Sequence, residues 1–196
     1  MRKPKRVLAL FILTALMFVI VVACTSSSNQ DAEASKLVTE ANKNVDKYNA
    51  LQKEIDDAWA KVNSFPATTE GFQEKAKVTQ EIESKVKQQH DEIKRAVDEF
   101  EKAYGMNISS DYKVYIKMLI DSTNKRLESN DYVLKMTQKT TEVAQAVAAG
   151  TATTESIDAA GKEIDDMSAK AQALESEGDK IKAKADQYFI DKKLGE

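Results

Sequence analysis

Residues 155–188 read ESIDAAGKEIDDMSAKAQALESEGDKIKAKADQY, and this stretch decides the fold class. Its apolar and small residues recur at alternating steps of three and four, at Ile157, Ala160, Ile164, Met167, Ala171, Leu174, Gly178, Ile181, Ala185 and Tyr188. Such steps give a 3.5-residue repeat, which is the repeat of helices that pack side by side with a left-handed crossing. The spacing therefore predicts one long helix with a single apolar face.

The same spacing occurs in three stretches upstream, at residues 32–62, 70–104 and 111–149. The apolar positions of the first two include Ala41, Val45, Tyr48, Ile55, Trp59 and Val62, then Ile82, Val86, Ile93, Ala96, Phe100 and Ala103. Residues typical of turns and helix ends separate the stretches, namely Pro66, Gly105 and Gly150. Sustained two-residue alternation is missing from the sequence, so we expect no sheet.

Four helices of roughly 31 to 39 residues, joined by loops of roughly four to seven, leave few arrangements open. Short loops favour consecutive helices that lie side by side and run in opposite directions. We therefore expect residues 32–196 to form one all-α domain, an antiparallel up-down-up-down four-helix bundle with long helices and heptad-like packing. The alternative is a more open pair of helical hairpins that associates with another chain.

The start of the chain has a different composition. Four of residues 1–6 are basic, and residues 7–22 (VLALFILTALMFVIVV) form an apolar run without a charge. This run is shorter than the ~20 residues that usually span a bilayer. A basic start, a short apolar run and a small residue before a polar stretch are typical of a secretory signal peptide. We expect residues 1–23 to be a signal peptide and residues 24–31 to be a flexible polar tether.

The only cysteine of the chain follows the apolar run, in the sequence Val21-Val22-Ala23-Cys24. This sequence resembles the lipobox of bacterial lipoproteins, in which signal peptidase II cleaves before a cysteine that carries a diacylglyceryl group. The resemblance implies an extracytoplasmic protein anchored through diacylglyceryl Cys24 to the cell membrane, or to the outer membrane if the host has one. Two acyl chains anchor a protein stably, whereas one holds it only marginally. The alternative is an uncleaved membrane anchor that ends in cysteine.

Composition excludes several classes of site. The chain has a formal net charge of −3, and four of its basic residues and no acid lie in the first 24 positions, so the remainder carries −7. An acidic chain lacks the basic face that nucleic acid requires. One cysteine and one histidine argue against metal sites of the usual ligand types, and Lys87 stands where a Glu-x-x-His motif ending at His90 would need glutamate. We expect no nucleic-acid partner, no metal, no cofactor and no catalytic residues.

Two polar residues, Gln89 and Thr123, lie at positions where the helices are expected to pack. If the loops set the levels of antiparallel helices, Gln89 comes near Thr123, Gly178 and either Asn42 or Asn44. A buried polar layer of this kind can fix the register of packed helices. The alternative interpretation is a small polar pocket for a ligand.

Phe65 and Phe72 flank the predicted loop between the first two helices, at the end of the bundle away from Cys24. Aromatic residues near helix ends most often cap the core. If they are exposed, they form a possible partner-binding tip, because aromatic residues dominate binding hot spots.

These patterns predict a membrane-anchored extracytoplasmic lipoprotein that acts as a non-catalytic interaction or structural protein of the cell envelope, with a protein partner there. Whether the chain forms a homo-oligomer stays open. One alternative is a ligand-binding or sensor bundle that uses the polar layer. Another is a holdase-like envelope chaperone that shields unfolded clients on an exposed apolar concavity.

Overall fold

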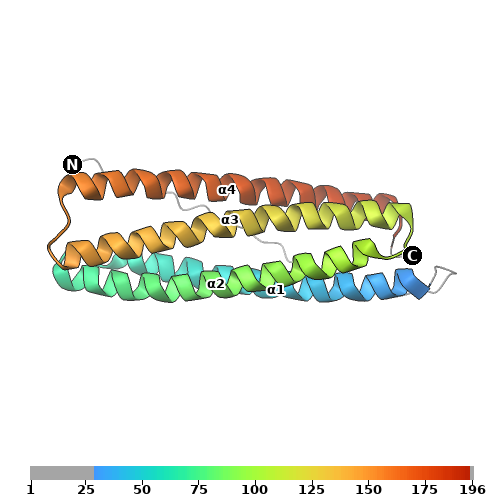
Figure 1. Cartoon of the computed structure of the whole chain (residues 1–196), viewed down its shortest axis with the longest axis horizontal. Helices are drawn as coiled ribbons and strands as arrows, with labels where there is room; N and C mark the ends of the chain where they lie inside the picture. Colours follow the sequence, from blue (N-terminus) through green and yellow to red (C-terminus); the bar gives the residue numbers. More distant parts are fainter. Residues whose placement is uncertain (1–28, 195–196) are drawn as a thin grey trace.

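The computed structural model describes residues 29–194, which fold into four α-helices. These helices are α1 (Asn29–Ser64), α2 (Thr69–Gly105), α3 (Ser110–Ala148) and α4 (Thr154–Asp191), and no strand occurs within the described range (Figure 1). The all-helical prediction is confirmed, and the arrangement is consistent with a four-helix bundle. Helix α1 begins at Asn29, so residues 29–31 belong to this helix and not to the expected tether. None of the four helices is long and apolar enough to cross a membrane.

Side-chain caps fix where three of the helices begin. The hydroxyl of Thr68 accepts a hydrogen bond from the Gly71 amide (3.1 Å), which satisfies one of the free N–H groups at the start of α2. Ser109 and Thr153 cap α3 and α4 in the same way, and Ser156 completes a capping box at α4. Helix α3 ends before Gly150, whose φ of +69° is a conformation that glycine adopts without strain.

The elongated molecule has two ends (Figure 1), and the two ends differ in how their side chains pack. We call the near end the one that holds the start of α1, the α2–α3 loop and the end of α4, and the far end the one that holds the other two loops. A near-end cluster of buried residues draws on all four helices and includes Ala34, Val38, Phe100, Tyr115, Ile116 and Ala185. A far-end cluster, built around Ile55, Val62, Val78, Ile82 and Val86, draws on α1, α2 and α3 but takes no residue from α4.

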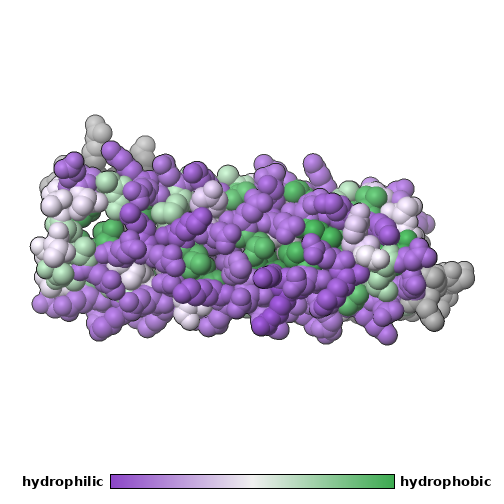
Figure 2. All heavy atoms as spheres, in the orientation of Figure 1, coloured by the Kyte–Doolittle hydropathy of each residue, from purple (hydrophilic) through white to green (hydrophobic). Residues whose placement is uncertain are grey.

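Helix α4 packs less completely than the others. Extensive close packing joins consecutive helices, α1 with α2, α2 with α3 and α3 with α4. The buried residues of α4 are all small, namely Ala160, Ala171, Gly178 and Ala185. Its larger apolar residues Ile164, Met167, Leu174 and Ile181 are only half-buried. Figure 2 shows apolar side chains among the charged ones along one face of the molecule.

Contacts between helices fall at regular levels along the molecule. Between α1 and α2, Lys47 pairs with Glu92 and Glu54 with Lys85. Between α2 and α3, Thr79 meets Thr141 and Gln89 meets Asn130. Between α3 and α4, Arg126 pairs with Asp179 and Lys139 with Glu163. In each pair of helices, a higher residue number on one helix meets a lower number on the other.

Candidate functional site

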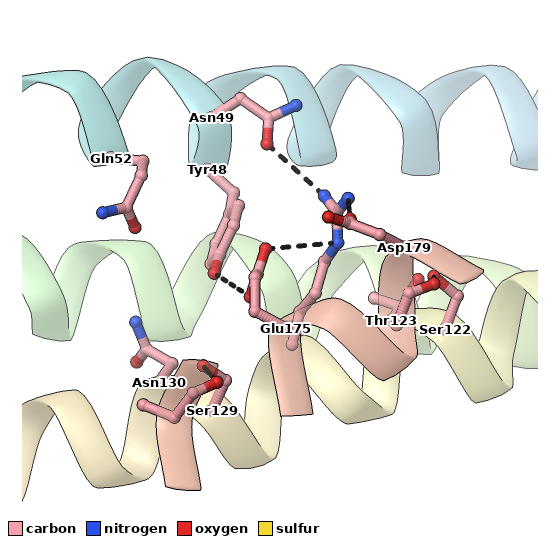
Figure 3. Close-up of polar contacts among 12 residues, drawn as sticks. Tyr48, Asn49, Gln52, Ser122, Thr123, Ser129, Asn130, Glu175 and Asp179 are labelled. Carbon is pink, nitrogen blue, oxygen red and sulfur yellow. Dashed lines mark hydrogen bonds and ion pairs between the residues drawn. The ribbon is translucent and has the colours of Figure 1, made fainter. Parts of the chain in front are cut away.

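Three charged side chains and a tyrosine hydroxyl join α1, α3 and α4 at mid-length (Figure 3). We call these four residues, Tyr48, Arg126, Glu175 and Asp179, the ion cluster. The guanidinium of Arg126 on α3 donates a hydrogen bond from Nη2 to Asp179 Oδ1 (2.7 Å) and lies with Nε 3.7 Å from Glu175 Oε1. The Tyr48 hydroxyl on α1 donates to Glu175 Oε2 (3.4 Å). The cluster thus links α1 to α4 through side chains.

The surroundings of the ion cluster shift its pKa values. Burial, with the Glu175 carboxylate as a second cause, raises the pKa of Tyr48 far above its ordinary value, so this hydroxyl remains a hydrogen-bond donor. Burial also raises the pKa of Glu175, although the positive charge of Arg126 opposes this change. For Arg126, burial acts to lower the pKa, but Glu175 and Asp179 outweigh it and the pKa is raised. Arg126 therefore stays positively charged.

A layer of amide side chains lies beside the ion cluster, and we call Gln52, Gln89 and Asn130 the amide layer. Gln89 on α2 donates from Nε2 to the Tyr48 carbonyl (3.2 Å) and to Gln52 Oε1 (2.9 Å), both on α1. Asn130 on α3 donates from Nδ2 to Gln89 Oε1 (2.7 Å). The Oδ1 atom of Asn130 is buried without a hydrogen-bond partner, which is costly for a polar atom unless water or a ligand meets it.

The structure places the other predicted members of the polar layer elsewhere. Thr123 is buried, but its hydroxyl donates to the Leu119 carbonyl of its own helix (2.7 Å). The carbonyl of Gly178 accepts a hydrogen bond from the Ser122 hydroxyl (2.8 Å). Gln89 is therefore brought together with Gln52 and Asn130 instead of with Thr123 and Gly178.

The spacing of residues in the sequence does not predict the ion cluster. Arg126 and Glu175 resemble the many charged residues that cover the outside of these helices, and nothing in their spacing marks them as partly buried. One signal was present, because Tyr48 lies in the apolar repeat of α1, and a buried tyrosine hydroxyl usually finds a polar partner.

At the far end, the predicted tip residues are half-buried. Phe65 packs against the far-end cluster, and so does Trp59. Phe72 lies under the ammonium group of Lys75, whose Nζ is 4.9 Å from the ring centroid. The exposed large apolar residue at this end is Ile157, in the first turn of α4, with 39% of its surface exposed.

Two further features bear on possible chemistry. Within residues 29–194, no group of histidine, cysteine, aspartate and glutamate side chains is arranged to hold a metal ion. His90 lies with Nε2 3.5 Å from Asp131 Oδ1 at a partly exposed position. The lipobox-like residues Val21, Val22 and Ala23, and Cys24 itself, lie outside the described residues.

No protein-family model, no curated protein sequence and no solved structure matches the chain.

Proposed function

We propose that the protein is a lipid-anchored, extracytoplasmic lipoprotein of the bacterial cell envelope that acts without catalysis and holds a protein partner at its far end. The observation that carries this proposal is the sequence Val21-Val22-Ala23-Cys24, which places the only cysteine directly after an apolar run and five residues before α1. A diacylglyceryl group on Cys24 would keep the near end at the membrane and leave the far end free.

The proposal includes an antiparallel up-down-up-down bundle with heptad-like packing. The opposite order of residue numbers in the inter-helix pairs supports the antiparallel direction. Buried residues at seven-residue intervals support the heptad-like packing; in α1 these are Ala34, Ala41, Tyr48, Ile55 and Val62, and in α2 they are Ile82, Gln89, Ala96 and Ala103. A straight helix rises ~1.5 Å per residue, so a bundle of this kind would carry its far end roughly 55 Å from the near end.

The anchor is tested by replacing Cys24 with alanine in the full chain. We expect the wild-type protein to carry a diacylglyceryl group on an N-terminal cysteine, to float with membranes and to incorporate a labelled fatty acid. The Cys24→Ala variant should lose the label and retain its signal peptide, because the acylated cysteine directs cleavage. Mass spectrometry of the N-terminal peptide measures both changes. A wild-type chain that keeps residues 1–23 and carries no lipid would contradict the proposal.

The partner is tested by a photo-crosslinking residue at Ile157, which is exposed at the far end, with the exposed mid-helix residue Ala50 as the matched control position. We expect one dominant adduct with another envelope protein from position 157 and none from position 50. Self-adducts alone, or no adduct, would count against a far-end docking site. Many different adducts would favour the holdase-like chaperone. Turnover of an envelope substrate by the purified protein would contradict a non-catalytic role.

A second candidate function is the binding of a small polar ligand at the amide layer, and the unpartnered Asn130 Oδ1 favours it. This function predicts that a small molecule with a hydrogen-bond donor raises the unfolding temperature of the wild-type protein but not of the Gln89→Leu variant. Thr123→Val is the matched control, because Thr123 is buried but bonds only its own helix. An equal shift in all three proteins, or no shift with a broad panel of molecules, would exclude this candidate.

A further inference from the structure

Exposed apolar side chains gather at the near end of the molecule. Across residues 30–194, four large apolar side chains are strongly exposed, and three of them are Tyr104 (40% exposed), Val114 (41%) and Ile190 (56%). Tyr104 and Ile190 each precede the last residue of their helix, and Val114 lies in the first two turns of α3. Each of the three therefore lies close to a helix terminus at the near end. The fourth, Ile157, lies at the far end.

Two of the near-end residues, Tyr104 and Val114, belong to a surface that combines apolar and basic groups. Tyr104, Val114, Met118, Lys113 and Lys117 line a shallow hollow of about 270 Å³ between α2 and α3. The Lys113 Nζ atom lies 5.8 Å from the Tyr104 ring centroid, and within the described chain Lys113 forms no ion pair. Tyrosine with lysine is the combination that proteins place at the level of lipid headgroups, because both side chains have an apolar body and a polar tip.

Two carboxylates of α3 close to this surface have neutralising neighbours. Asp111 accepts a hydrogen bond from the Tyr188 hydroxyl (2.7 Å) and lies 3.3 Å from Lys192 Nζ. Asp121 pairs with Lys117. These contacts reduce the repulsion that an acidic chain would otherwise meet at an anionic lipid surface.

The position of Cys24 determines which surface the near end can meet. Helix α1 begins at Asn29, at the near end. Five residue steps separate Cys24 from Asn29, and an extended chain covers at most ~3.6 Å per step, so the start of α1 can be no further than roughly 18 Å from an acylated Cys24. This distance is comparable to the thickness of one leaflet of a bilayer, at about half of ~40 Å.

We propose that the near end lies against the lipid bilayer, with Tyr104, Val114 and Ile190 in the headgroup layer and Lys113 beside anionic lipid. This inference rests on the proposed function, because it uses the acylated Cys24. The acyl chains provide the affinity, and the near-end surface sets the orientation. The bundle then stands with its long axis away from the membrane, which presents the far end to a partner.

Tryptophan fluorescence in vesicles tests the orientation in the full, acylated protein. The chain has one tryptophan, Trp59, which packs against the far-end cluster. In a Trp59→Phe background, Val114→Trp and Ile190→Trp each report on the near end, and Ile157→Trp is the matched control at the far end. Val114 and Ile157 are almost equally exposed, at 41% and 39%, so the substitutions place equally accessible reporters at the two ends.

The vesicles contain phosphatidylcholine with about a quarter phosphatidylglycerol, and the phosphatidylcholine is brominated on its acyl chains so that it quenches nearby tryptophan. We expect about twofold lower fluorescence for tryptophan at 114 and at 190 than in unbrominated vesicles, and unchanged fluorescence at 157. Circular dichroism verifies that every variant keeps its helices.

Acylation and flotation with the vesicles are measured on the same samples, so the two proposals fail in different ways. The protein can be acylated and float while its near-end tryptophans are quenched no more than the far-end one. This result would overturn the inferred orientation and leave the anchor intact. Equal quenching at all three positions means that the bundle lies flat on the membrane, which also overturns it. Protein without lipid on Cys24 contradicts the proposed function and, with it, the reason for this orientation.

Discussion

Arg126 of α3 holds two carboxylates of α4 in the middle of the molecule. Its side chain is 11% exposed and meets Glu175 (22% exposed) and the more exposed Asp179. Its Nε atom is buried without a hydrogen bond, since the 3.7 Å separation from Glu175 is too long for one. A partly buried ion pair loses much of its hydration, so the loss of one partner usually costs more than the loss of both.

The substitution Arg126→Met should therefore lower the free energy of unfolding by about 3 kcal/mol, because the partly buried Glu175 then loses its cation. The double variant Arg126→Met/Glu175→Gln should recover most of this loss, because glutamine is uncharged and can still accept the Tyr48 hydrogen bond. Asp179 is half-exposed and can be hydrated. Urea denaturation of the purified protein measures both. A double variant less stable than the single one would show that the ion cluster contributes more than its desolvation costs.

Glu175 should also make stability depend on pH. Burial raises its pKa above the ordinary value of 4.5, against the opposing effect of Arg126. The folded state then keeps the Glu175 proton to a higher pH than the unfolded state does. Between 4.5 and the raised pKa, the contribution of Glu175 to the free energy of unfolding falls as pH rises, and it is fully present only below 4.5.

The corresponding experiment compares denaturation at several pH values for the wild type, Glu175→Gln and Glu177→Gln. Glu177 is the matched control, because it is an exposed glutamate two residues further along α4 that pairs with Lys125. We expect Glu175→Gln to gain stability relative to the wild type as pH rises above 4.5, and Glu177→Gln to lack this trend. If the free energies of unfolding of the wild type and of Glu175→Gln change in parallel with pH, the folded and unfolded states bind the Glu175 proton equally, which would contradict the prediction.

At the scale of single elements, α3 and α4 approach each other through small residues. The hydroxyl of Ser122 donates to the Gly178 carbonyl, and that of Ser129 donates to the Ala171 carbonyl (2.9 Å). A Cβ atom on Gly178 would lie 3.0 Å from the Ser122 carbonyl oxygen, which is a backbone atom and cannot move alone. Gly178 therefore sets the separation of the two helices at mid-length.

In Gly178→Ala, overpacking should cost about 1–3 kcal/mol of the free energy of unfolding. The better helix propensity of alanine should offset about 1 kcal/mol of this cost, so we expect the variant to be less stable than the wild type. Gly161 lies in the same helix and has no atom within 4 Å of an added Cβ. Gly161→Ala should thus stabilise the protein by up to about 1 kcal/mol. Thermal unfolding of the two variants gives the comparison. Stabilisation by both substitutions would mean that α4 can shift away from α3 at no cost.

The sequence predicts the elements well because helical periodicity and caps are local properties. The helix expected from about residue 111 begins at Ser110, with Ser109 as its cap, and the helix expected from residue 155 begins at Thr154, with Thr153 as its cap. Gly105 is the last residue of α2, and Gly150 follows the end of α3, as their positions between periodic stretches predict. Each of these features depends on residues only a few positions apart.

The register between neighbouring helices does not follow from such local properties. Gln89 was expected near Thr123, but it meets Asn130, which is seven residues further along α3. A heptad-like pattern looks the same after a shift of seven residues, so only side-chain fit between helices selects one register. For the same reason, Arg126 could not be assigned to Glu175 and Asp179 from spacing alone.

Over the whole molecule, packing is uneven along α4. At the near end, Ala185 belongs to a cluster that draws on all four helices. In the first 17 residues of α4, residues 154–170, the one buried residue is Ala160, and a Lys139–Glu163 ion pair (2.7 Å) ties this segment to α3. Local stability follows the number of buried apolar contacts, so the far half of α4 should open at a lower free energy than the near half.

Hydrogen exchange on the acylated protein in detergent micelles measures this difference. We expect amides in residues 158–168 of α4 to exchange at least ~10-fold faster than those in residues 178–188, which corresponds to a local difference of about 1.4 kcal/mol. Helix α2 is the internal control, because its far half holds Val78, Ile82 and Val86 of the far-end cluster and should be as protected as its near half. Uniform protection along α4 would show that half-buried residues such as Ile164 and Met167 pack as firmly as a closed core. The partner crosslinked from position 157 can then be added to the same sample. If exchange in the far half of α4 slows, the partner orders this segment, because binding to the closed state suppresses opening.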